Sequence, residues 1–249
     1  MGGISAQRVF EKLDEYFGKN DYAAAERHLL YWVKEAEALD DTRNQLAFWN
    51  ELAGLYRKIG KETEALNAVE TLLSLVAQMG IEEDVGAGTT YINCATVYKA
   101  FSRAKEAMPL FEKAKKVYEA DLPKGDKRFG GLYNNMALAL ADLKRFAEAY
   151  AFYEKAIAVM QATDDGNLEV AITYLNIASA KEAERGVVES EAEIEEYLEK
   201  ARVLLDHHTV RDGYYAFVCE KCAPTFGYYG HFMYEKELKA RAKEIYERA

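Results

Sequence analysis

Proline, cysteine and long apolar stretches are scarce in this chain, and each scarcity narrows what the protein can be. Only three prolines occur in 249 residues, which leaves long segments free to form helices, because proline disrupts a helix interior. Three cysteines provide no disulfide framework, which fits a reducing compartment. The sequence shows no apolar run of membrane-spanning length and no basic-then-apolar leader. We therefore expect a helical, cytoplasmic protein.

Basic residues are fewer than acidic ones, because the chain has 32 Lys and Arg but 42 Asp and Glu, which gives a net charge of −10. Proteins that bind nucleic acid or anionic membranes neutralise phosphate groups with basic side chains. We therefore expect neither nucleic acid nor a membrane as partner. The sequence also lacks a glycine-rich phosphate loop, a nucleophile elbow and a metal-binding His/Glu helix. It predicts no enzyme activity, no catalytic residue, no metal site and no cofactor.

The chain does contain a pattern that repeats with a period of 42 residues. The segment Tyr133-Asn134-Asn135-Met136-Ala137 has a counterpart 42 residues earlier in Tyr91-Ile92-Asn93-Cys94-Ala95. A shift of 41 residues forward gives Tyr174-Leu175-Asn176-Ile177-Ala178. A fixed period of this size indicates supersecondary units that stack on one another.

The repeat predicts an all-α solenoid of about six antiparallel helix pairs in a single domain, residues 1–249. The predicted pairs cover residues 5–40, 42–80, 84–121, 126–163, 167–206 and an irregular capping pair 211–248. Glycines 60 and 80 are predicted to turn the chain or end helices. Ser190 and Glu193 are predicted to form a capping box that restarts a helix. Pro224 is predicted to end or kink the helix that starts at Tyr214.

These residues resemble the tetratricopeptide repeat family. Its pattern of large aromatic, Leu-type, small and Tyr residues on the first helix matches Tyr91-x-x-Cys94-Ala95-x-x-Tyr98. Its second-helix pattern matches Ala107, Phe111 and Ala114. The usual unit of the family has about 34 residues. The 42-residue period of this chain resembles that of a subgroup with longer helices, which includes kinesin light chains and bacterial peptide-sensing regulators. The resemblance implies a right-handed superhelix whose first helices line a concave groove that binds proteins or peptides.

The resemblance also places one register of the first helices at this groove. Asparagine is a poor residue for a helix interior, so its recurrence in one register is unexpected. A carboxamide can bond both the N–H and the C=O of a peptide backbone. The predicted ligand-binding residues are Asn93, Asn135 and Asn176, with Glu51 in the same register and Asn50 and Asn134 one place earlier. In the alternative interpretation, each asparagine bonds a neighbouring helix and fixes the stacking of the repeats.

Aromatic residues are dense in the last pair, where most are predicted to be core. Part of this cluster is a candidate partner patch or dimer surface, consisting of Tyr214, Tyr215, Phe217, Tyr228 and Tyr229. Cys219 and Cys222 lack the second pair of ligands of a structural zinc site, so we interpret them as buried packing residues.

The sequence thus predicts a non-enzymatic adaptor that binds a protein or peptide of unknown identity in its groove. One alternative is a structural protein that forms homo-oligomers through the aromatic last pair. Another is a ligand-responsive regulator that acts on a separate effector protein, because the first repeat begins close to the start of the sequence.

Overall fold

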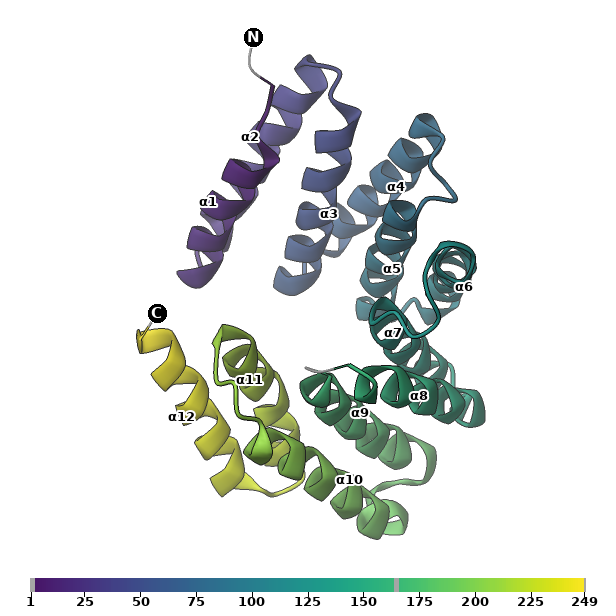
Figure 1. The fold of residues 1–249 in the computed structure, drawn as a ribbon, viewed down its shortest axis with the longest axis vertical. Coiled ribbons are helices and arrows are strands. Elements are labelled where there is room, and N and C mark those ends of the chain that lie inside the picture. Colours follow the sequence, from purple (N-terminus) through teal and green to yellow (C-terminus); the bar gives the residue numbers. More distant parts are fainter. Residues whose placement is uncertain (1–2, 164–165, 249) are drawn as a thin grey trace. The chain divides into compact units, whose positions relative to one another are not determined.

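The computed structural model describes residues 3–163 and 166–248, and its regular elements are all α-helices (Figure 1). The chain divides into two compact units, unit 1 over Met1–Leu122 and unit 2 over Pro123–Ala249. The predicted all-α fold of antiparallel helix pairs is confirmed within each unit. The prediction that both units form one solenoid domain stays a prediction.

Unit 1 contains three helix pairs. Its helices are α1 (Ala6–Gly18), α2 (Tyr22–Ala38), α3 (Thr42–Ile59), α4 (Glu62–Met79), α5 (Val85–Ala100) and α6 (Ala104–Asp121). The two helices of each pair pack against each other, and α2 and α4 also pack on the first helix of the next pair. The first helices α3 and α5 lie against each other as well.

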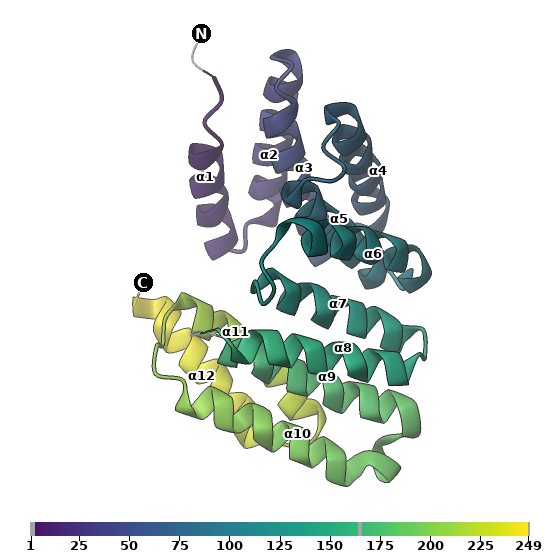
Figure 2. The same ribbon diagram turned by 45° about the vertical axis from the view of Figure 1, so that its right-hand side comes forward.

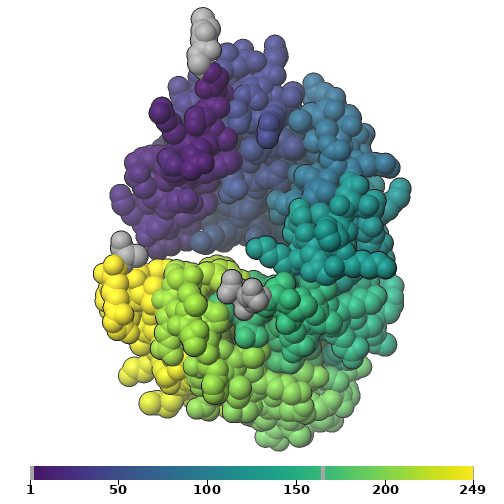
Figure 3. Space-filling model, in the orientation of Figure 1, coloured from purple at the N-terminus to yellow at the C-terminus, as the bar shows by residue number. Residues whose placement is uncertain are grey.

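Unit 2 contains three further helix pairs. Its helices are α7 (Arg128–Asp142), α8 (Phe146–Gln161), α9 (Asn167–Arg185), α10 (Val187–His207), α11 (Gly213–Tyr228) and α12 (Phe232–Arg248). Helix α8 packs on the first helix of the next pair. The first helices α7, α9 and α11 follow one another in contact, and Figure 2 shows α7, α8, α9 and α10 as successive layers. In the space-filling view, side chains close the gaps between paired helices (Figure 3).

The residues of the 42-residue pattern form the core. The alanines of the pattern let helices approach closely, and larger side chains fill the remaining space. Fully buried members of the pattern are Ala53, Ala95, Ala137 and Ala178 on the first helices and Ala65, Ala107, Ala149, Phe111, Tyr153 and Leu198 on the second helices. The predicted core register is therefore confirmed.

The turns inside the helix pairs share a residue with positive φ that glycine spacing alone does not reveal. Gly60 ends α3 with a positive φ of 73°, as predicted for a glycine C-cap. Ser102 and Lys144 follow at intervals of 42 residues and also adopt a positive φ, 60° in each case. Asn20, Gly186 and Gly230 have positive φ in the corresponding turns of the other pairs. Each pair therefore reverses direction through a turn that contains one residue with positive φ.

One sequence prediction about a helix start is wrong, and a second is decided in part. Ser190 does not cap a helix, because α10 already begins at Val187, directly after the turn at Gly186. The buried Ser190 hydroxyl donates instead to the Lys181 carbonyl at 3.0 Å. Of the two outcomes predicted for Pro224, an end of the helix is excluded, because α11 continues to Tyr228, and a kink stays a prediction. The Pro224 ring is exposed, so water can reach that side of the helix and compensate for the missing backbone donor.

A second periodic feature joins the two helices of three successive pairs. The ammonium of Lys113 lies 5.6 Å from the ring centre of Tyr91. The equivalent contacts measure 6.0 Å between Lys155 and Tyr133, and 5.8 Å between Lys200 and Tyr174. A cation over an aromatic ring contributes about 0.5–1 kcal/mol at exposed sites. The 42-residue pattern is therefore found in lysine–tyrosine contacts between paired helices as well as in the buried core residues.

We expect Tyr153→Phe to stabilise unit 2 by about 1 kcal/mol. The Tyr153 hydroxyl is buried and has no hydrogen-bond partner among the described residues, so its removal relieves a desolvation penalty. Phe111 occupies the same repeat position and is fully buried without a hydroxyl. Urea unfolding of both proteins would measure the change.

The matched control is Tyr118→Phe, because the Tyr118 hydroxyl is bonded to Thr89 at 2.9 Å. This control should destabilise the protein. Equal destabilisation by both substitutions would show that Tyr153 has a partner and would contradict the prediction.

Candidate functional site

The predicted site asparagines all lie on first helices and are half-buried. Asn50 lies on α3, Asn93 on α5, Asn134 and Asn135 on α7, and Asn176 on α9. We call the surface that they share within each unit the first-helix face. In unit 1 it carries Asn50 and Asn93, and in unit 2 it carries Asn134, Asn135, Asn176 and Ser179.

In unit 1, the two asparagines form a directed chain of hydrogen bonds. Asn93 Nδ2 donates to Asn50 Oδ1 at 2.9 Å. Asn50 Nδ2 in turn donates to the Leu46 carbonyl at 2.9 Å and to Thr90 Oγ1 at 3.3 Å. The pair therefore ties α5 to α3. Such a tie is the stacking role that the alternative interpretation predicts.

In unit 2, Asn176 repeats the contact of Asn93. Its Nδ2 donates to Asn134 Oδ1 at 3.1 Å and ties α9 to α7. Asn135 behaves differently, since its Nδ2 donates to the Gly131 carbonyl of its own helix at 2.9 Å. The predicted role of Asn93, Asn135 and Asn176 in contacting a ligand stays a prediction.

The two asparagine pairs that bond between helices do not join equivalent positions of the repeat. Each acceptor asparagine stands one place before the aligned position, so Asn50 pairs with Asn93 and Asn134 pairs with Asn176. The corresponding position on α5 is Ile92, and hydrocarbon side chains offer no acceptor. In the sequence, the adjacent asparagines 134 and 135 indicate that two neighbouring positions of the first helix carry polar side chains with different partners.

Glu51 occupies the aligned register on α3 and is half-buried. Burial raises the pKa of its carboxyl group, and the negative charge of Asp14 raises it further. Asn50 on the neighbouring position contacts α5 through its bond with Asn93.

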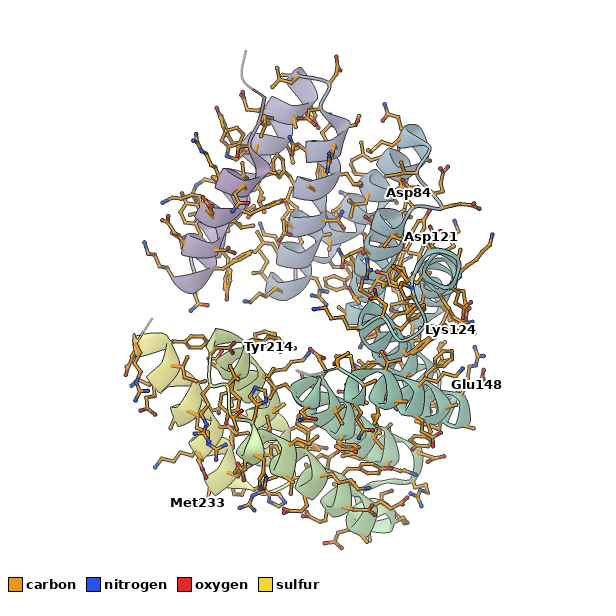
Figure 4. The ribbon with its side chains drawn as sticks, viewed as in Figure 1. Asp84, Asp121, Lys124, Glu148, Tyr214 and Met233 are labelled. Atoms are coloured by element: carbon orange, nitrogen blue, oxygen red, sulfur yellow. The ribbon has the colours of Figure 1, made fainter. Side chains whose placement is uncertain are left out.

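The predicted aromatic patch separates into buried and exposed members. Tyr215 is fully buried and bonds the Leu205 carbonyl, so it contributes no exposed surface. Phe217 and Tyr228 are exposed, Tyr229 is half-buried, and Tyr214 extends from the start of α11 (Figure 4).

Tyrosine hydroxyls of this cluster bind two glutamates of α9. Tyr214 donates to Glu169, and both Tyr228 and Tyr229 donate to Glu182 at 2.6 Å. Burial and the bond to Glu169 raise the pKa of Tyr214. These phenol–carboxylate bonds fasten the last helix pair to α9, which gives part of the aromatic cluster a structural role.

A pocket of about 640 Å³ lies beside the first-helix face of unit 2. Its lining residues are Lys127, Arg128, Gly131, Met160, Thr163, Glu169 and Tyr214. Gly131 connects the pocket to the candidate site, because its carbonyl accepts the bond from Asn135. A Cβ atom added at Gly131 would meet no atom within 4 Å, so this part of α7 is open.

Cys94, Cys219 and Cys222 are buried, which confirms the prediction made for Cys219 and Cys222. Burial raises the pKa of both Cys94 and Cys222 to about 12, so these thiols stay protonated at neutral pH. Within residues 3–163 and 166–248, no set of three His, Cys, Asp or Glu side chains is arranged to hold a metal ion. The helices of the same residues include none with the length and apolar character to span a bilayer.

The helix pairs and their packing define a helical-repeat protein. The tetratricopeptide repeat family model matches residues 44–120 and 129–186, more than half of the chain. The chain therefore belongs to the tetratricopeptide repeat family. No curated protein shows significant sequence similarity to it.

Solved structures share this fold at low sequence identity. BtubC (BKLC) from P. vanneervenii is 20% identical with a TM-score of 0.69, and the match covers 82% of each chain. A putative kinesin light chain from Podosopora anserina is 21% identical with a TM-score of 0.65, covering 80% of this chain and 93% of that one. NprR in complex with its cognate peptide NprX is 14% identical with a TM-score of 0.60, and the match covers 94% of this chain and 64% of the NprR chain.

Proposed function

We propose that this protein is a non-enzymatic scaffold that binds an extended peptide, free or as part of a protein, on its first-helix face. The observation that carries the proposal is the set of asparagines on successive first helices. Asn93, Asn135 and Asn176 are half-buried, and their Oδ1 atoms accept no hydrogen bond from the described residues. Family membership supports the same function, and the structurally similar NprR has been solved with a peptide.

The spacing of the first helices suits an extended chain. Packed helices lie about 8–10 Å apart, and an extended strand advances about 3.3 Å per residue. Asn135 on α7 and Asn176 on α9 would therefore meet backbone groups about three residues apart. Contacts to the backbone hold a peptide without selecting its sequence, and pockets between them select side chains. The pocket beside Gly131 supports such a role, because it lies next to Asn135.

The test is a selection of short random peptides displayed on phage against the immobilised full chain. Peptides that bind wild type should bind Asn135→Ala at least about tenfold more weakly, which corresponds to about 1.4 kcal/mol. Asn135 is the most informative position, because its carboxamide bonds only its own helix among the described residues. Its replacement should therefore leave the packing between helices intact.

The control is Asn67→Ala on α4, whose side chain is exposed on a second helix. This variant should bind the selected peptides as tightly as wild type. Equal binding by wild type and Asn135→Ala, or no selected peptide at all, would contradict the proposal.

The exposed aromatic side chains favour a second candidate function, self-association through the last helix pair. Phe217 is 50% exposed, Tyr228 69% and Met233 80%, and Met233 points away from the helices (Figure 4). Light scattering over a range of concentrations would detect such a homo-oligomer. Phe217→Ser should then reduce the measured mass, and a concentration-independent monomer mass would exclude this function.

A further inference from the structure

The open face of α2 carries a large aromatic side chain where three later second helices carry threonine or lysine. Tyr31 is 55% exposed, although α2 packs on both α1 and α3 (Figure 2). At the equivalent position, counted from the positive-φ residue of each turn, α4, α6 and α8 carry Thr71, Lys113 and Lys155. The exposed tyrosine is therefore a departure from the repeat that packing within unit 1 does not explain.

Tyr31 belongs to an aromatic cluster that reaches from α2 to α1. Its ring meets the ring of Trp32 edge to face, with the ring centres 5.3 Å apart. The Trp32 ring in turn lies 6.4 Å from His28, and His28 lies 5.6 Å from Tyr16 of α1. Trp32, His28 and Tyr16 are half-buried. Neighbouring rings thus support Tyr31, and tyrosine is enriched in the buried cores of protein interfaces.

Two opposite charges flank Tyr31 at equal distances along the same face of α2. Arg27 lies about one turn before Tyr31 and Glu35 about one turn after it, so the three side chains follow one another at helical spacing. Arg27 and Glu35 are exposed, and neither forms an ion pair with another described residue. The face therefore presents a positive, an aromatic and a negative group in a row.

This row is complementary to itself when two helices run antiparallel. If two α2 helices cross at Tyr31, Arg27 of each copy faces Glu35 of the other, because the two residues are equally far from the crossing point. A parallel pair would instead place arginine against arginine and glutamate against glutamate. Contact through the same surface on both copies is the isologous arrangement of a two-fold dimer.

We propose that the chain forms a two-fold dimer through this face of α2, with Tyr31 at the centre and two ion pairs between Arg27 and Glu35 of opposite copies. The proposal goes beyond peptide binding, because α2 is a second helix and carries none of the asparagines of the first-helix face. The tyrosines supply the apolar contact, whereas exposed ion pairs add little affinity and mainly select the orientation. A contact of one helix per copy is small, so we expect a dissociation constant in the micromolar range.

Light scattering on the full-length protein over a range of concentrations tests the proposal, and circular dichroism checks that each variant is folded. The wild-type mass should rise from monomer to dimer with concentration. Arg27→Glu and Glu35→Arg should each weaken the dimer at least about tenfold, because the two-fold axis makes either substitution act twice. Tyr31→Ser should weaken it as well. Lys105→Glu on α6 changes the charge as Arg27→Glu does, and this exposed control should dimerise like wild type.

A mixture of the two charge reversals gives the sharpest test of the antiparallel pairing. Equimolar Arg27→Glu and Glu35→Arg proteins should form a heterodimer, because both glutamates of one copy then face both arginines of the other. The double variant R27E/E35R should dimerise with itself like wild type, since its two charges are exchanged.

Three results would overturn the inference. They are a wild-type mass that stays monomeric up to millimolar concentration, a dimer insensitive to the changes at Arg27, Tyr31 and Glu35, and a mixture that does not restore the dimer. A dimer lost with Phe217→Ser but kept with Tyr31→Ser would assign self-association to the last helix pair instead. Tyr31 lies outside the first-helix face, so peptides selected on wild type should bind Tyr31→Ser with unchanged affinity.

Discussion

Gly88→Ala is expected to destabilise unit 1 by about 2 kcal/mol, in the range of overpacked core substitutions. A Cβ atom at Gly88 would lie 2.6 Å from Cε1 of Tyr118, which is closer than van der Waals contact allows. Tyr118 cannot move aside easily, because its ring is buried and its hydroxyl is bonded to Thr89 at 2.9 Å. Urea unfolding of the variant and wild type would measure the loss.

The matched control is Gly54→Ala in α3, where an added Cβ atom meets nothing within 4 Å. Alanine is favoured over glycine in a helix interior by about 0.5–1 kcal/mol, so this variant should be more stable than wild type. The opposite signs separate the steric effect from the helix propensity of alanine. Stabilisation by both substitutions would show that α5 and α6 can move apart without penalty.

Arg241→Ala is expected to lower the free energy of unfolding by about 2–3 kcal/mol, because it leaves a partly buried carboxylate with fewer donors. Arg241 is 15% exposed, and its guanidinium contacts Asp206 at 2.8 Å and the Tyr215 hydroxyl at 3.0 Å. Asp206 also accepts a bond from Tyr234 at 2.9 Å. These contacts join α12 to α10 and α11. Thermal or urea unfolding would measure the change.

The charge of Asp206 gives this prediction a pH dependence. Burial acts to raise its pKa, but the bonds from Tyr234 and Arg241 hold it below the ordinary value. The stabilisation is therefore present above the unfolded pKa of about 3.9 and is lost as the pH falls through the lower folded value. Arg241→Ala should reduce this acid dependence.

Arg248→Ala is the control for Arg241, because Arg248 is an exposed arginine that pairs with Glu244 within the same helix. Exposed ion pairs contribute little to stability, so this variant should unfold like wild type. Similar losses from both arginines would mean that net charge, and not the contact with Asp206, explains the effect.

The period of 42 residues predicts the fold, because packing between helices requires small side chains at fixed positions of each repeat. Alanines such as Ala95 and Ala137 are fully buried where helices approach, and a larger residue would separate the helices. The turns inside the pairs are harder to predict. Ser102 and Lys144 adopt the left-handed conformation although neither is glycine, because the helices on both sides determine the backbone at the turn.

The candidate site could be predicted only in part. The sequence locates the asparagines on the first helices, since their register follows from the repeat. It does not reveal that Asn93 bonds Asn50 while Asn135 bonds Gly131, because these bonds depend on the relative rotation and translation of neighbouring helices. Ser190 shows the same limit, since its partner is the Lys181 carbonyl of the preceding helix.

The left-handed turn residues have a consequence for engineering. In the turns at Gly60, Ser102 and Lys144, φ lies between 60° and 73° at intervals of 42 residues, so each of these turns reverses the chain with a similar backbone φ. A segment of one period, cut between equivalent turns, presents the same two ends as the segment that it replaces. Binding surfaces built on this scaffold could therefore be lengthened, shortened or shuffled in whole modules.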